Sequence, residues 1–542
     1  MKHNRLKPIA IIMALALLFA ALPALSLAET RSVRSDIWDG SAASALSGSG
    51  TAEEPYLITN GSELAYLAAQ TELGNRFENC CFRLENDIYL NDVSDFDEWE
   101  STFPQLTPWT PIGLALYEED DFGDLTIDDS KCFMGNFDGY GHTVYGMFID
   151  GAGDRPSDSG FGLFGCSSGI IENLSVECVY ITANDYLGAI VGYMNGGTIT
   201  NCTAGGLIYG VWEAGGIVGT AQGGSIVNCS STAKVSGAGG NAGGIVGSAS
   251  YSTINSCSNH GHVGAAFQAG GIVGSAFCSE IENCANLALV DGSCVIGGIA
   301  GDLYFSELRC SYNAADVRTV FEPDFVEEDG FTVGGICGYA EGEGVVISDC
   351  YNAGTVSGSF NAGGLCGVLD GNAQVVRCYS AELTIGQLGA DALIGAIAPE
   401  ASAGTENCLY LASESGAQSE HGAAATSEEL MSESAYTGFD FNTVWYFPEC
   451  SEYPYAQLVS NPYSDESAPE PEPEPGIPGD VNGDGAVSIA DAVLAMRLTM
   501  GIIGEEELEN GGIVASNADF NGDGSIDISD AMLIARAALE LN

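Results

Sequence analysis

The feature that most constrains this chain is an internal repeat of about 27 residues that starts near residue 160. Each copy holds a small-apolar-glycine unit, such as GGIVG at 215–219 and 243–247, and then a unit ending in cysteine, such as IVNC at 226–229. The last glycines of successive units are 27, 27, 28, 27, 27, 37 and 29 residues apart, and the longest step contains an acidic insertion at 321–330. Self-similarity this regular indicates a stack of repeated units rather than one irregular globular core.

The length of the repeat selects the architecture. Twenty-seven residues are too few for a four-stranded propeller blade, and no helical periodicity separates the units. Short β-branched runs bounded by Gly, Asn and Ser are typical of strands and turns. We therefore expect a mainly β fold, a right-handed parallel β-helix or solenoid with about three strands per coil, stacked at about 4.8 Å. One buried aliphatic ladder is predicted at Ile190, Ile217, Ile245, Ile272 and Ile299.

Cysteine recurs at one phase of the repeat, at Cys202, Cys229, Cys257, Cys284, Cys310, Cys350, Cys378 and Cys408. A ladder of disulfides or metal ligands is one interpretation, and a stack of buried thiols is the other. Residues stacked in register keep their Cβ atoms near 4.8 Å, which is wider than the roughly 3.8 Å that a disulfide prefers. Cysteine is also a small and readily buried hydrophobe. We expect most of these thiols to be free and packed in the core.

The GGIVG units followed by I-x-N-C resemble the GLUG-motif repeats of bacterial surface and secreted proteins. The resemblance extends upstream to residues 48–58 and 133–149 and downstream to a closing segment at 426–458. It implies no particular activity. Independently, the pattern of residues 62–73 predicts a short amphipathic helix that would cap the open end of a solenoid core.

The first residues are typical of a secretory signal, with basic Lys2, Arg5 and Lys7, an apolar run and a small-residue cleavage site at 26–28. A retained membrane anchor is the alternative, but the apolar run is short and interrupted by Pro23. After removal of the signal we expect no membrane span. The predicted organisation is a signal at 1–28, a cap and entry coils at 29–160, the GLUG-repeat solenoid at 161–410, a closing segment at 411–460, a Pro/Glu linker at 461–478 and a C-terminal domain at 479–542.

The C-terminal domain contains two copies of one motif, DVNGDGAVSIAD at 480–491 and DFNGDGSIDISD at 519–530. Both copies place oxygen ligands at positions 1, 3, 5, 7, 9 and 12 and glycine at position 6, which is the spacing of a calcium loop. The hard Ca²⁺ ion prefers many oxygen ligands. The predicted ligands are Asp480, Asn482, Asp484, Ala486 (carbonyl), Ser488, Asp491, Asp519, Asn521, Asp523, Ser525 (carbonyl), Asp527 and Asp530.

Each loop runs into an apolar-periodic helix, and no helix clearly enters it, so the pattern resembles the type I dockerin family over residues 479–542. The resemblance implies a small α-helical domain, two bound Ca²⁺ ions and docking onto cohesin domains of scaffold proteins in cellulosome-like complexes. The docking residues that it implies are Ile489, Ala490, Met496 and Arg497 in the first copy and Ile528, Ser529, Ala535 and Arg536 in the second. Ile489 and the long segment 501–518 depart from many relatives, which leaves the particular cohesin open.

Charge limits the other functions. With 15 Lys+Arg against 74 Asp+Glu, the net charge of −59 excludes nucleic-acid binding, which needs a basic surface. No catalytic motif is evident. Residues 160–410 lack the basic cluster that a polysaccharide lyase needs. The acidic stretches 92–100 and 118–129 offer candidates for the paired carboxylates of a hydrolase, although solvated loops are favoured. His260 and His262 could share a metal, although an exposed pair at a turn is favoured.

The leading hypothesis is a secreted β-solenoid that docks onto a cohesin scaffold and acts as a binding or structural module, with polysaccharide or another surface protein as its ligand. A polysaccharide-degrading enzyme, either a glycoside hydrolase or a lyase, is the alternative, and a surface adhesin or spacer is the third. A row of exposed aromatic side chains would favour carbohydrate binding, whereas a cleft with converging carboxylates would favour an enzyme.

Overall fold

The computed structural model describes residues 36–461, apart from 103–104, 120–124, 152–159, 320–330, 359–360, 382–383, 387–393, 399, 402–403, 413–420 and 449–452, together with Ala495. The chain divides into two compact units, Met1–Pro462 and Tyr463–Asn542. In the second unit the structure describes only Ala495, which is helical and buried. The predicted acidic insertion at 321–330 lies outside the described residues.

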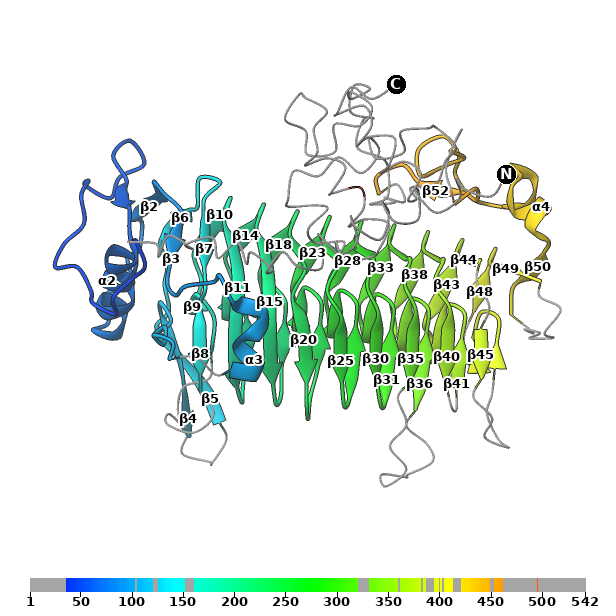
Figure 1. The fold of residues 1–542 in the computed structure, drawn as a ribbon. Coiled ribbons are helices and arrows are strands. Elements are labelled where there is room, and N and C mark those ends of the chain that lie inside the picture. The colour runs from blue at the N-terminus through cyan, green and yellow to red at the C-terminus, as the bar shows by residue number, and fades with distance from the viewer. Residues whose placement is uncertain are drawn as a thin grey trace, which may run out of the picture. The chain divides into compact units, whose positions relative to one another are not determined.

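The first unit is a parallel β-solenoid of about 11 turns, as the repeat predicted (Figure 1). One sheet has 12 strands, from β1 (Tyr56–Ile58) to β48 (Thr405–Glu406), and two others have nine and eight strands. A fourth face contains the long strands β11 (Ser175–Ala183) and β15 (Thr203–Gly210). The strands of these four faces are paired in parallel from turn to turn, so backbone hydrogen bonds run along the axis of the stack.

Each turn holds more strands than the three that were expected. The turn that begins at residue 218 contains β17 (Val218–Gln222), β18 (Ser225–Val227), β19 (Ser230–Ser231), β20 (Lys234–Gly237) and β21 (Ala242–Gly243). The GGIVG unit spans a corner, because its first glycine ends one strand and its valine begins another. A β-carbon on Gly243 would lie 1.9 Å from the carbonyl oxygen of Val246, so only glycine fits this corner.

The predicted isoleucine ladder is confirmed. Ile190, Ile217, Ile245, Ile272 and Ile299 are all fully buried. Their amides also connect the turns, as when the N–H of Ile217 donates to the carbonyl of Ile245 at 3.0 Å. Burying one such side chain per turn is worth about 1.5–3 kcal/mol each relative to exposure, which stabilises the stack along its whole length.

A second interior ladder is polar and was not predicted. It occupies the bend between the paired short strands, at Ser231, Asn259, Asn286, Asn313, Asn352 and Ser380, all buried. The amide of Asn286 donates to Oδ1 of Asn313 at 2.7 Å and to the carbonyl of Ala288 at 2.8 Å. Asn259 donates in turn to Oδ1 of Asn286 at 2.8 Å. Each amide therefore satisfies the backbone of its own bend and the amide of the next turn.

The cysteine ladder is present, with one correction. Seven of the predicted cysteines are buried, and burial raises the pKa of such thiols, as at Cys257. Cys310 instead lies one position earlier in the turn, with a φ of 49°, and Ser311 takes its place inside. Cys132 and Cys166, which lie before the repeats or at their start, form a disulfide, and the other described cysteines are free.

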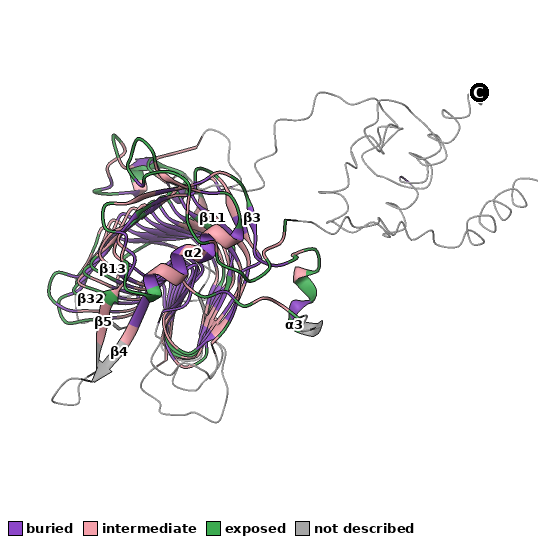
Figure 2. Ribbon diagram, turned by 90° about the vertical axis from the view of Figure 1, so that its left-hand side faces the viewer, coloured by how far each residue is buried: buried purple, intermediate pink, exposed green. Residues whose placement is uncertain are grey.

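The predicted cap is a helix, α2 (Gly61–Glu72), which lies across the end of the stack in the axial view of Figure 2. Asn60 caps it by accepting from the N–H groups of Ser62 and Glu63 at 3.1 Å. Leu64 and Leu67 are fully buried against the first turns. The hydroxyl of Thr71 accepts from the N–H of Gly113 at 2.9 Å, which ties the helix to the solenoid.

The closing segment, described over residues 421–461 apart from 449–452, returns over the outside of the later turns (yellow to orange in Figure 1). It contains α4 (Ser427–Leu430) and the antiparallel pair β51 (Trp445–Tyr446) and β52 (Gln457–Leu458). A capping box formed by Thr426 and Glu429 begins α4. The segment thereby covers one long corner of the later turns, whereas the same corner of the earlier turns is open.

Candidate functional site

The corner of interest lies between the 12-stranded sheet and the fourth face, which contains β11. One residue per turn adopts positive φ there, between 49° and 55°, and we call this set the corner ladder. Its members are Asn173, Asn201, Asn228, Ser256, Asn283, Cys310, Asp349, Arg377 and Asn407. Asparagine and aspartate tolerate this left-handed conformation better than other non-glycine residues, which explains the asparagine of the I-x-N-C unit.

The side chains of the corner ladder contact one another along the axis. Asn228 donates to Oδ1 of Asn201 at 2.7 Å, and Asn201 donates to Oδ1 of Asn173 at 3.1 Å. Further along, the guanidinium of Arg377 pairs with the carboxylate of Asp349, with Nε 2.8 Å from Oδ1. The ladder thus presents amides at one end and an ion pair towards the other.

Beside the corner ladder runs a second line of side chains, which we call the outer row. Successive strands pair these residues directly, at Ser175, Thr203, Ser230, Ser258, Ala285, Tyr312, Tyr351, Tyr379 and Leu409. The three tyrosines are fully buried and stack in parallel, with ring centroids 4.9 and 5.2 Å apart. The row therefore changes from hydroxyl side chains to apolar ones along the axis.

The closing segment covers the apolar half of the outer row. Trp445 is fully buried and packs 5.8 Å from the ring of Tyr379, while its indole N–H donates to Oδ1 of Asp349 at 3.1 Å. Tyr453 stacks on Tyr351 at 5.6 Å. Near the end of the described segment, Ser460 donates to Oδ1 of Asn283 at 2.7 Å.

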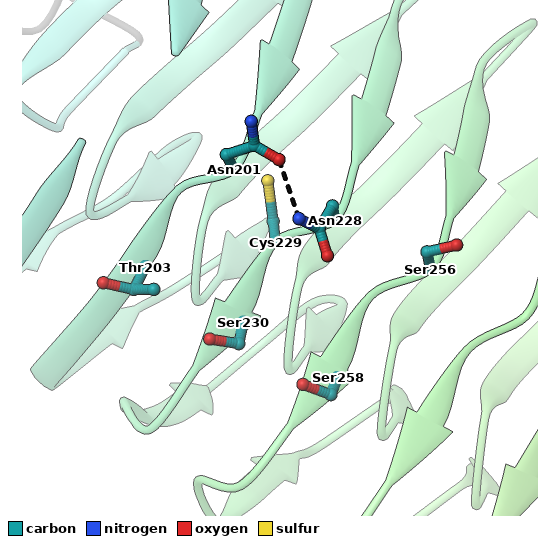
Figure 3. Close-up of a pocket in the computed structure, with 7 residues that line it drawn as sticks. All are labelled: Asn201, Thr203, Asn228, Cys229, Ser230, Ser256 and Ser258. Carbon is teal, nitrogen blue, oxygen red and sulfur yellow. Dashed lines mark hydrogen bonds between the residues drawn. The ribbon is translucent and has the colours of Figure 1, made fainter. Parts of the chain in front are cut away.

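The polar half of the same corner is an open groove, shown in Figure 3. Its lining residues come from the ends of β14 (Thr198–Thr200), β18 and β23 (Thr253–Asn255) and from the strands that follow them. They are Asn201, Thr203, Asn228, Cys229, Ser230, Ser256 and Ser258, and the cavity volume is about 380 Å³. None of these side chains is charged, and most are hydroxyls or amides that donate and accept hydrogen bonds.

A carboxyl and an imidazole lie next to the groove. Glu177 accepts from the hydroxyl of Ser175 at 3.2 Å, and burial raises the pKa of its carboxyl. His260 lies 3.0 Å from the hydroxyl of Ser258 through Nε2. These contacts hold the hydroxyl groups in place along the outer row.

A row of exposed aromatic side chains is also present, at the opposite edge of the 12-stranded sheet. Tyr251, Phe277 and Phe305 are 61%, 38% and 51% exposed, on three successive turns. Their ring centroids are 5.5 and 6.0 Å apart, and neighbouring rings meet at 82° and 81°. The rings thus stand edge to face and do not form one flat surface.

The described residues of the two acidic stretches considered for catalysis have separate hydrogen-bond partners. Glu100 accepts a 2.7 Å hydrogen bond from the hydroxyl of Tyr209, on the fourth face. Asp128 accepts from the N–H and the hydroxyl of Ser130, and these hydrogen bonds lower the pKa of its carboxyl. The two best-formed pockets of the described ranges are lined by residues of neither stretch.

The two histidines have separate partners. Nε2 of His262 lies 3.1 Å from Oδ1 of Asp291, whose other oxygen contacts Arg318 at 3.1 Å. His260 contacts Ser258 instead. Among the residues that the structure describes, no three His, Cys, Asp or Glu side chains form a group suited to a metal ion.

Two protein families match parts of this sequence. The GLUG motif matches residues 210–236, which include Asn228 and Ser230 of the groove, and the type I dockerin domain matches residues 478–539. The chain carries a GLUG motif and a type I dockerin domain. Both resemblances expected from the sequence are thereby confirmed.

The predicted calcium ligands and docking residues of the dockerin domain fall within 480–536, outside the described residues. Type I dockerin domains generally bind calcium. The donor set suits that ion, because every predicted ligand offers oxygen and each loop contributes at least three carboxylates. Because these residues lie outside the described part of the chain, the assignment of individual calcium ligands stays a prediction.

Two other similarities cover different shares of the chain. Halomucin of Haloquadratum walsbyi is 30% identical over 175 residues, which are 32% of this chain and 2% of that protein. A structure described as a putative immunoglobulin A1 protease from Bacteroides ovatus covers 76% of this chain and 95% of that chain, at 19% identity and a TM-score of 0.35. A likeness at that score does not bear on function.

The groove was missed in the sequence, although its signal is visible there. The triplets Asn-Cys-Thr at 201–203, Asn-Cys-Ser at 228–230 and Ser-Cys-Ser at 256–258 place a polar residue on each side of the buried cysteine. Alternation along a strand sends both neighbours of a buried residue outward. The surface position of these hydroxyl groups could thus have been predicted from the sequence. The covering of the later turns by the closing segment could not.

Proposed function

We propose that this protein is a secreted β-solenoid that a calcium-loaded dockerin domain attaches to a cohesin domain of a scaffold protein, in a cellulosome-like assembly. The observation that carries the proposal is the type I dockerin match at residues 478–539. The solenoid would be the attached body, acting as a binding or structural module. Its regular surface supports this role, because equivalent side chains recur at each turn.

The calcium ions would be held by the two duplicated loops. Asp480, Asp484 and Asp491 would supply carboxylates in the first loop, and Asp519 and Asp523 would do so in the second. Bound Ca²⁺ neutralises these closely spaced carboxylates. Without the ion their mutual repulsion opposes the folded loop, so calcium loading and folding of the domain are coupled.

Docking would use the helices that leave the loops. Ile489 and Arg497 in the first copy correspond to Ile528 and Arg536 in the second. This correspondence supports docking through either copy, because both would offer an apolar residue and a guanidinium to the cohesin. The guanidinium favours hydrogen bonds to carboxylates or carbonyls at an interface.

Secretion is the compartment that fits this role. Residues 1–28 have the charge and hydropathy pattern of a secretory signal. In the described part of the chain, no helix has both the length and the apolar character needed to cross a membrane. An extracellular location would also bring the dockerin domain into contact with millimolar calcium, well suited to extracellular calcium modules.

Calorimetric titration of the full chain with calcium tests the proposal, followed by capture on immobilised type I cohesins. We expect two Ca²⁺ ions per chain in the wild type and one in each of Asp480→Ala and Asp519→Ala, with capture abolished by chelator. Asp316→Ala, which changes a solenoid carboxylate outside both loops, is the matched control and should bind two ions. Absence of calcium binding by the wild-type chain would contradict the proposal.

A further inference from the structure

The corner ladder accepts hydrogen bonds from the closing segment in one stretch. In the neighbouring stretch the ladder is open and lines the groove. Ser460 donates to Asn283 and Trp445 donates to Asp349, so two members of the ladder accept hydrogen bonds from the closing segment. Asn283 is the next member of the ladder after Ser256, which is the last ladder residue that lines the groove. The open groove therefore continues a surface that the closing segment, through its paired strands β51 and β52, already covers.

The outer row determines what kind of chain each stretch accepts. Under the closing segment the row presents Tyr351 and Tyr379, and it meets aromatic side chains. In the groove the same row presents Thr203, Ser230 and Ser258, which are hydroxyls. An occupant of the groove must therefore satisfy hydroxyls and amides rather than pack against rings.

The charge around the groove selects an uncharged ligand. Its lining side chains are neutral, Glu177 lies at one end, and the chain as a whole has a net charge of −59. These carboxylates repel a polyanion such as a polyuronate, and the lining offers no cation to bind one. Sugar hydroxyls, in contrast, match groups that both donate and accept.

We propose that this groove binds an extended, neutral polysaccharide chain aligned with the solenoid axis. The hydroxyl and amide groups repeat once per turn, at about 4.8 Å, and the rise per residue of a β-1,4-linked sugar chain is comparable. Successive sugars then meet equivalent groups on successive turns, at Asn201 and Thr203 and then at Asn228 and Ser230. The inference gives a ligand class to the solenoid of the proposed function and does not depend on docking.

The exposed aromatic row is the competing site for the same ligand. Sugar rings stack on flat aromatic faces, but Tyr251, Phe277 and Phe305 meet edge to face. The row also lies at the far edge of the 12-stranded sheet, after β22 (Val246–Ser250) rather than beside β19. Variants at the two sites therefore separate the two possibilities.

Affinity electrophoresis of the full chain through gels containing hydroxyethylcellulose, arabinoxylan or glucomannan tests the proposal. We expect at least one of these neutral polysaccharides to retard the wild type, while polygalacturonate does not. Ser230→Trp, which fills the groove, should weaken binding at least tenfold. Ser236→Trp, on the outer side of β20 in the same turn, is the matched control and should bind as the wild type does.

Two further variants keep the test decisive. Asn228→Gly suits the φ of 52° and removes only the amide, so it should weaken binding several-fold even where Ser230→Trp disturbs folding. Phe305→Ser should have no effect. Chelation of calcium should leave retardation unchanged, which separates this result from loss of cohesin docking.

The proposal is overturned if none of the neutral polysaccharides retards the wild type. It is also overturned if Ser230→Trp and Asn228→Gly are both retarded as strongly as the wild type. Loss of binding in Phe305→Ser alone would assign the ligand to the aromatic row instead. Retardation by polygalacturonate, or a wild-type dimer that Ser230→Trp dissociates in the absence of glycan binding, would also contradict a neutral polysaccharide as the occupant.

Discussion

The hydroxyl of Ser460 donates a 2.7 Å hydrogen bond to Oδ1 of Asn283, 177 residues earlier in the chain. This contact lies where the corner of the solenoid changes from a surface covered by the closing segment to an open polar groove. The closing segment is therefore part of the solenoid structure as far as Ser460, and the Pro/Glu linker follows directly in the sequence. Its attachment is open to test.

Trp445→Ala should release the closing segment from the later turns. Trp445 is fully buried among Tyr351, Tyr379 and Phe439, and truncation of a buried tryptophan costs about 3–5 kcal/mol. Hydrogen exchange of residues 436–458 should accelerate at least about 100-fold. Trp212→Ala, at an exposed tryptophan, should change exchange little, and equal behaviour of the two variants would show that the segment is not held by Trp445.

Asn286→Ala should destabilise the solenoid far more than Asn286→Ser. The alanine leaves Asn259 and the carbonyl of Ala288 each without one hydrogen bond, at about 1–3 kcal/mol for each buried group. Serine already occupies the equivalent position at Ser231, where it accepts from the N–H of Ala233 at 3.2 Å. Thermal unfolding midpoints measure the difference, and equal midpoints for the two variants would contradict the role of the amide ladder.

Asp302→Asn should stabilise the protein at neutral pH and not at low pH. Burial raises the pKa of the Asp302 carboxyl from 3.8 to about 6. A carboxyl with a raised native pKa binds a proton more tightly when folded, so its favourable contribution is complete below pH 3.8 and is lost as pH rises through about 6. The shift corresponds to at most about 3 kcal/mol.

The difference between the unfolding midpoints of Asp302→Asn and wild type, measured from pH 4 to pH 8, checks this prediction. It should grow with pH and level off above about 7. Asp316→Asn, at a carboxylate for which no such burial exists, is the control. A difference that is independent of pH would show that Asp302 ionises normally in the folded state.

Most cysteines should be free. Cys132 and Cys166 form the disulfide of the described residues, and burial raises the pKa of the Cys337 and Cys366 thiols well above the ordinary value. Thiol counting without reductant should therefore find few reactive groups in the native protein and most of the 18 cysteines after denaturation. A count near zero in denaturant would mean that the ladder is disulfide-bonded.

The repeated part of the fold follows from local physical chemistry, which is why the sequence predicts it well. The glycine corners, the isoleucine ladder and the buried cysteines each depend on residues within one turn and its neighbours. The helix near residues 62–73 could be predicted for the same reason, from its own periodicity. The prediction that Cys310 belongs to the buried cysteine ladder was wrong, because Cys310 stands one residue before the buried position of its turn. Ser311 fills that position.

The site depends on contacts that no local pattern contains. That Tyr351 and Tyr379 are buried under Trp445 requires the chain to return over 66 or more residues, as the separation of Tyr379 and Trp445 shows. Burial of the two tyrosines could not be predicted, because alternation along the strand directs both side chains away from the interior of the solenoid. The groove lies beyond the last described contact of this return, Ser460 on Asn283, so its extent could not be predicted from the repeats alone.

The most direct test of the account is titration of the full chain with a type I cohesin, in calcium and in chelator. The account predicts one cohesin per chain in calcium and none in chelator. Changing Ile489 and Arg497 to Ala, or Ile528 and Arg536 to Ala, should preserve binding because either copy can dock, whereas combining the four changes should abolish it. Equal binding with and without calcium, or no binding to any type I cohesin tried, would contradict the account.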